Sequence, residues 1–219
     1  FDVEALSKEF FDKYKAKYEK FCNYIYDNRN DETLFGHEFA EWDEKLIRDY
    51  VKKLLGRIVF LHFLQKKGWL GVPVDKQWGE GDTQFMRNLF KASTQKQKDN
   101  YLDLVLEPLF AGALNTQRPN DIFDLNVEGF RTTRIPYLNG GLFERDALDE
   151  PKSTFPASYF EDLFEFFYQY NFTIDENDPN DAEVGIDPEM LGHIFENLLE
   201  DNKDKGAFYT PKEIVQYMC

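Results

Sequence analysis

Residues 43–67, DEKLIRDYVKKLLGRIVFLHFLQKK, decide the fold of this chain. Their apolar positions recur at three- and four-residue steps and cover more than half of a helix's circumference, which predicts a helix at the centre of the molecule. Basic residues in the last turn, followed by Gly68, predict where this helix ends. The apolar set comprises Leu46, Ile47, Tyr50, Val51, Leu54, Leu55, Ile58, Val59, Leu61 and Phe63.

Two polar residues stand within this apolar run. We interpret His62 as a hydrogen-bonded core histidine rather than a catalyst, because the sequence shows no acidic or nucleophilic partner for it. Arg57 is a charge on a mostly buried helix, so it requires a carboxylate partner. The sequence leaves the identity of that partner open.

The helical period continues on both sides of the central helix. Apolar residues at three- and four-residue steps predict a long amphipathic helix over residues 2–26 and a short helix from Phe85 to Phe90. A third runs from Tyr101 to Phe110, interrupted near Pro108. The next is predicted to open with a capping box, Ser158-x-x-Glu161, and carries a Phe stripe that is typical of a core.

Residues 112–157 follow a different pattern, with several Pro and Gly and no long helical period. Within them, residues 135–144 read IPYLNGGLFE, and Asn139-Gly140-Gly141 is a strong turn signal between apolar neighbours. The predicted fold is therefore mostly α, an irregular multi-helix domain with five to seven helices and at most a small β-hairpin near residues 135–144.

The composition is that of an acidic globular protein. Hydrophobic residues make up 42% of the 219 residues, including 22 Phe, and the formal net charge is −15. Enough apolar surface exists for a packed core. A chain this acidic is poorly suited to a broad phosphate-binding surface, so we expect it to bind duplex DNA weakly or not at all by itself.

Cysteine and histidine usage predicts neither a disulfide framework nor a metal site. Cys22 and Cys219 stand at opposite ends, which fits a reducing cytoplasm, and the three His show no metal-ligand spacing. No apolar run approaches the roughly 20 residues that a membrane helix needs. Phe1 in place of an initiator Met, and Cys219 inside an expected helix, predict a piece excised from a longer protein.

The last stretch with chemical content is Gly206-Ala207-Phe208-Tyr209-Thr210-Pro211. Thr210 is predicted to cap a helix, Pro211 suits the first helical position, and Glu213 completes a capping box. A helix start of this kind favours an anion, because its free N–H groups and its dipole point toward the ligand. The pattern is also an ordinary way to begin a helix, and spacing alone does not separate the two readings.

The Ile186–Leu199 segment, followed by the Gly206–Pro211 stretch, resembles the start of the methyltransferase domain in DNA adenine-N6 methyltransferases. The likeness is greatest to large single-chain type IIG restriction–modification enzymes and to the modification subunits of type I systems. It implies that Phe208, Tyr209, Thr210 and Pro211 help to hold S-adenosylmethionine. The string Asn139 to Glu144 also resembles a segment upstream of that domain, with no chemistry assigned to it.

This resemblance implies two parts, a helical connector over residues 1–185 and the start of a truncated methyltransferase domain over residues 186–219. The Gly-rich turn and the Asn-Pro-Pro-aromatic motif that adenine methylation needs are missing, so no residue is assigned a catalytic role and the segment should be inactive alone. DNA would be bound by other parts of the parent enzyme, with its nuclease and methyltransferase domains as partners. The alternative is a helical protein-interaction module without enzymatic descent, whose acidic surface binds a basic partner.

Overall fold

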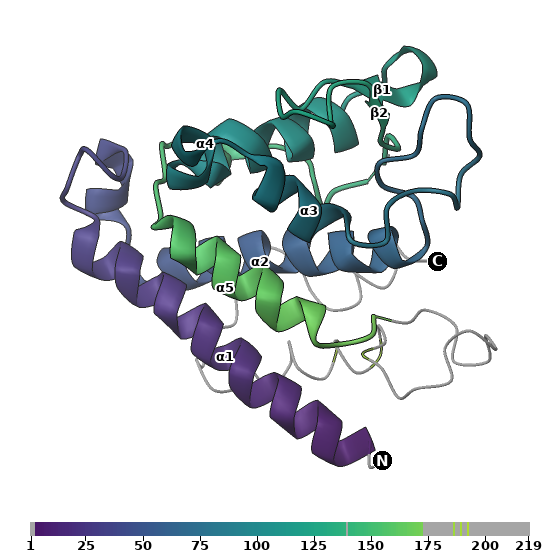
Figure 1. Cartoon of the computed structure of the whole chain (residues 1–219). Coiled ribbons are helices and arrows are strands. Elements are labelled where there is room, and N and C mark those ends of the chain that lie inside the picture. The colour runs from purple at the N-terminus through teal and green to yellow at the C-terminus, as the bar shows by residue number, and fades with distance from the viewer. Residues whose placement is uncertain (1–2, 139, 173–185, 187–188, 190–191, 193–219) are drawn as a thin grey trace.

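A computed structural model of the chain describes residues 3–138 and 140–172, together with Ile186, Glu189 and Gly192 (Figure 1). Within that part the fold is mostly α, which confirms the predicted class. The α-helices are α1 (Val3–Asn28), α2 (Glu44–Lys66), α3 (Phe85–Ala92), α4 (Gln95–Asp99) and α5 (Ala157–Tyr168). Two π-helices, η2 (Leu102–Leu106) and η3 (Pro108–Leu114), and three 3-10 helices, η1 (His37–Glu41), η4 (Pro119–Asp121) and η5 (Ala147–Asp149), join them.

Helix α2 lies at the centre, as its apolar pattern predicts. Every residue from Asp49 to Gln65 is buried. The Asp43 side chain caps its start by accepting a hydrogen bond from the N–H of Leu46. Gly68 ends it at a φ of 75°, and a Cβ there would lie only 2.2 Å from the Gly79 carbonyl oxygen, so glycine alone fits this stop.

Helix α1 packs against α2, and aromatic side chains of α5 contact both of them, with α3 on the other side of α5 (Figure 1). Phe167 of α5 contacts both Phe10 of α1 and His62 of α2. Phe164, from the same helix, meets Phe90 of α3. The Phe stripe of α5 is therefore core, as the sequence indicated.

The predicted capping box at Ser158 is wrong. Helix α5 starts at Ala157, with Pro156 as its N-cap and no side-chain capping hydrogen bond. The N–H of Tyr159 already donates to the Pro156 carbonyl, so Ser158 lies inside the first turn, where its hydroxyl cannot cap the helix.

Pro108 interrupts its helix in a specific way. The chain forms π-helix on both sides of Glu107, and the N–H of Glu107 donates to the Leu102 carbonyl five residues earlier. A proline lacks the N–H for a normal helical bond and its ring crowds the preceding turn, and a wider turn relieves both problems. The predicted interruption is confirmed.

A small antiparallel hairpin exists, but it precedes residues 135–144. Strand β1 (Ile122–Phe123) pairs with β2 (Thr133–Arg134), with Ile122 opposite Arg134. The described residues of 135–144 contain no strand, because their backbone groups bond elsewhere. The Leu142 and Glu144 carbonyls both accept hydrogen bonds from the Arg57 side chain of α2.

Candidate functional site

The residues that the family resemblance assigns to a cofactor lie outside the described part of the structure. Phe208, Tyr209, Thr210 and Pro211 are among them, as is most of the helix expected over residues 186–199. The division into a connector and the start of a methyltransferase domain also stays a prediction.

His62 is a core residue, as interpreted from the sequence. Its Nδ1 lies 2.8 Å from the Ile58 carbonyl oxygen one turn earlier, and its ring contacts Phe167 and Phe172. Burial lowers the pKa of His62 to about 4, so the imidazole is neutral at physiological pH and donates from Nδ1. A neutral ring packed among Phe side chains has a structural role.

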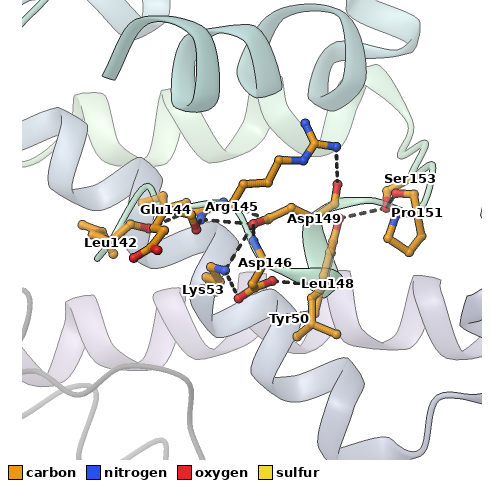
Figure 2. A network of polar contacts seen from close by, with 11 residues as sticks. Tyr50, Lys53, Leu142, Glu144, Arg145, Asp146, Leu148, Asp149, Pro151 and Ser153 are labelled. Carbon is orange, nitrogen blue, oxygen red and sulfur yellow. Dashed lines mark hydrogen bonds and ion pairs between the residues drawn. The ribbon is translucent and has the colours of Figure 1, made fainter. Parts of the chain in front are cut away.

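The main polar feature is a charge network that joins α2 to residues 142–153, which we call the α2 network (Figure 2). Arg57, with only 3% of its side chain exposed, donates from Nη1 to Oδ1 of Asp149 at 2.9 Å. Its Nε–H donates to the Leu142 carbonyl at 2.7 Å and its Nη2 to the Glu144 carbonyl at 3.1 Å. Asp149 is therefore the carboxylate partner that the sequence left open.

Lys53, one turn before Arg57, completes the pairing. Its Nζ donates to Asp149 at 3.3 Å and forms an ion pair with Asp146, and the Lys53 and Asp146 side chains point toward one another in Figure 2. The Asp146 carboxylate also caps η5 by accepting from the N–H of Leu148, and Asp149 accepts from the N–H of Asp146. Two buried cations thus meet two carboxylates that are themselves locked in a capping box.

A second contact fixes the far end of the same segment. The Tyr50 hydroxyl lies 2.8 Å from Oγ of Ser153, and Ser153 pairs with Phe35 in an antiparallel bridge. The N–H of Gly36 donates to the Lys152 carbonyl. Residues 142–153 are therefore held between α2 and the loop that precedes it in the chain.

Burial and charge set the protonation of this region. Burial alone would raise the pKa of Asp149, but the Arg57 charge and the hydrogen bonds from Asp146 and Arg57 outweigh it and lower that pKa. Burial, and then the negative charge of Asp149, raise the pKa of Glu107 to about 7. Two carboxyls with pKa values driven apart can divide acid and base roles. Here the Asp149 carboxylate is already paired with Arg57 and Lys53, so it is not available for acid–base chemistry. We therefore interpret the α2 network as structural: it positions residues 142–153 on α2.

Helices α2 and α5 also border a surface cavity of about 210 Å³, which sequence reasoning missed. Its walls include His62, Gln65 and Lys66 of α2, Gln84, and Phe172 beyond α5. Phe172 pairs with Ile186 in a parallel bridge beside it. The lining residues His62 and Phe172 are 110 positions apart in the chain, so no local sequence motif predicts the cavity.

No metal site or membrane helix is found in the described residues. No group of three or more His, Cys, Asp or Glu side chains there could hold a metal ion. None of the helices that the structure describes is long and apolar enough to cross a membrane.

The class that emerges is an irregular helical module built on a central buried helix and a charge network. The chain is 32% identical over 197 residues to a protein of Methanocaldococcus jannaschii named "Putative type II restriction enzyme and methyltransferase". The match covers 82% of this chain and spans 15% of that protein. No family model matches the chain. No solved structure matches it either.

Proposed function

We propose that this chain is the helical connector and the start of the methyltransferase domain of a restriction–modification enzyme that methylates adenine N6 in DNA, working in the cytoplasm. Residues 1–185 form the connector and residues 186–219 the start of the next domain. The observation that carries the proposal is the 32% identity over 82% of this chain to the archaeal restriction enzyme and methyltransferase. By itself the chain is inactive and supplies a scaffold and one wall of the cofactor pocket.

The scaffold role rests on the α2 network. Arg57 and Lys53 hold residues 142–153 against the most buried helix, and the chain passes from there directly into α5. Beyond α5, Phe172 pairs with Ile186, where the second part is proposed to start. A rigid helical frame of this kind gives a following catalytic domain a defined point of attachment.

The cofactor role belongs to Phe208, Tyr209, Thr210 and Pro211, whose residue types fit S-adenosylmethionine. The two aromatic rings would cover apolar parts of the donor and exclude water, while Thr210 and the loop backbone would offer hydrogen bonds. The carboxylate of the donor would suit the N-terminus of the helix that Pro211 is predicted to begin. The donor supplies the methyl group, and these residues hold it.

The enzymatic assignment is tested with the longer protein that contains this chain. Its sequence should show, soon after Cys219, a hydrophobic strand ending in a Gly-rich turn, and later an Asn-Pro-Pro-aromatic motif. Incubated with labelled S-adenosylmethionine and duplex DNA, it should transfer label to adenine N6, whereas the 219-residue chain should transfer none. Absence of both motifs would favour the acidic interaction module instead.

The cofactor residues are tested by Thr210→Val in the longer protein. This substitution should weaken donor binding, but it would also remove the predicted helix cap, worth about 1 kcal/mol. Thr94→Val is the matched control, because the Thr94 side chain accepts a hydrogen bond from the N–H of Gln97 at 3.2 Å and caps α4, in a different part of the sequence. If both variants lose stability while each keeps the parent's donor affinity, Thr210 is only a cap and the assignment fails.

A further inference from the structure

A local positive charge stands out in this acidic chain. Residues 83–98, TQFMRNLFKASTQKQK, contain Arg87, Lys91, Lys96 and Lys98 and no Asp or Glu, whereas the whole chain carries −15. The run forms α3 and most of α4. Although Asp99 ends α4, a cluster of cations on two adjacent helices is the footprint expected of a polyanion contact.

The side chains of this run border a surface groove of about 280 Å³, which we call the α3–α5 groove. Its lining includes Arg87, Phe90, Lys91 and Lys98 on one side and Glu161 and Glu165 of α5 on the other. Arg87 pairs with Glu165 at 2.7 Å and lies over the Tyr168 ring, so these two charges cancel. Lys91 and Lys98 face a single remaining carboxylate, Glu161.

Neither lysine has an ion-pair partner among the described residues. The Lys98 ammonium instead lies over the Phe90 ring, 5.4 Å from its centroid. Two lysines of α1 differ from them: Lys8 pairs with Asp12, and Lys13 pairs with Glu9. Surface cations without a carboxylate keep their full charge for an external anion.

We propose that Lys91 and Lys98 contact the phosphate backbone of duplex DNA while other parts of the enzyme read its sequence. The inference rests on the proposed function for the identity of the polyanion. A protein with a charge of −15 repels phosphates, so any part of it that approaches DNA needs a local excess of cations. Phosphate contacts fix orientation on the duplex without reading bases, which suits a connector.

The test compares two double variants of the longer enzyme that remove the same charge. Lys91→Gln with Lys98→Gln alters the groove, and Lys8→Gln with Lys13→Gln is the control on α1. Affinity for a labelled duplex is measured by fluorescence anisotropy between about 50 and 200 mM salt. The groove variant should flatten the slope of log K against log salt by about 1.8, because each phosphate contact contributes about 0.9. The ratio of the parent's affinity to the variant's affinity should then fall about 12-fold between 50 and 200 mM salt.

Each outcome decides the matter. Equal slopes for the two double variants, or no DNA binding by the parent, would overturn the inference and leave Lys91 and Lys98 as solvated surface. A third variant with Lys91→Arg and Lys98→Arg should restore the parent slope, since both cations are kept. Methyl transfer at saturating DNA is measured in parallel. If the parent methylates adenine but the groove variant has the parent's salt slope, only the DNA contact of Lys91 and Lys98 is contradicted. If the groove variant flattens the salt slope but the parent never methylates adenine, only the proposed function is contradicted.

Discussion

Replacing Asp149 by Asn removes one negative charge from the α2 network while keeping the shape of the side chain. The carboxylate is 7% exposed and accepts hydrogen bonds from Arg57, Lys53 and the N–H of Asp146. After the substitution, Lys53 still pairs with Asp146, whose side chain is 40% exposed, whereas Arg57 loses its carboxylate and keeps the Leu142 and Glu144 carbonyls. Removing one partner of a buried pair typically costs about 3–5 kcal/mol, because the remaining charge is left uncompensated.

Glu107 determines how much stability the Asp149→Asn variant should lose within that range of about 3–5 kcal/mol. The Asp149 charge is the second cause, after burial, of its raised pKa of about 7, and Arg57 acts in the opposite sense. Without Asp149, Glu107 should ionise more readily and partly replace the lost charge. We therefore expect a loss near the lower end, about 3 kcal/mol, at neutral pH. The double variant Asp149→Asn with Glu107→Gln should then lose more stability than the sum of the changes in the two single variants.

The measurement is urea unfolding of the 219-residue chain, followed by circular dichroism. Asp124→Asn is the matched control, because Asp124 forms an exposed ion pair with Arg131 at 3.8 Å and should change stability by less than about 1 kcal/mol. If Asp149→Asn is as mild as this control and does not couple to Glu107→Gln, then the α2 network does not hold residues 142–153.

Two further predictions concern titration and packing. Because the pKa of Glu107 is raised to about 7, its proton stabilises the native state below the ordinary Glu pKa, and that stabilisation is lost as the pH rises to about 7. In urea unfolding, the Glu107→Gln variant should therefore have the same free energy of unfolding as the parent near pH 4.5 and a free energy about 1–3 kcal/mol higher near pH 8. The control, Glu128→Gln at an exposed position, should have the parent's stability at both pH values. Leu54→Ala should lose about 2–5 kcal/mol of stability, because Leu54 is buried in α2 with 5% exposed. Leu104→Ala is the control and should lose less than about 1 kcal/mol, because Leu104 is 37% exposed. Equal melting curves for the two variants would show that Leu54 is not buried in a central helix.

Much of the helical frame follows from the sequence because its causes are local. The period of α2 and its stop at Gly68 are properties of neighbouring residues, and so is the break at Pro108. Local rules mislead at Ser158, where Pro156 starts the helix two residues earlier than the capping box implied. They also misplace the hairpin, because a turn signal at Gly140 and Gly141 does not say what the flanking backbone will bond to.

The partner of Arg57 is the clearest case of information that the sequence lacks. Asp149 lies 92 positions away, in a stretch without helical period and among many other acidic residues. Burial of α2 shows that Arg57 needs a carboxylate, yet any of 41 Asp and Glu could serve. The choice depends on how residues 142–153 fold over α2, which is a property of the whole core. The same holds for the α3–α5 groove, whose two sides come from separate parts of the chain.

The α2 network bears on geometry more than on stability. Buried ion pairs often contribute no more to folding than apolar side chains of the same volume, so stability alone does not explain two cations on the most buried helix. Arg57 does what no apolar residue could: its planar fork binds the Leu142 and Glu144 carbonyls together with Asp149. A segment with no strand and only the three-residue helix η5 thereby acquires one register on α2. Since α5 follows directly, the network also sets where the chain leaves the helical frame toward Ile186, and so how this module would meet a neighbouring domain.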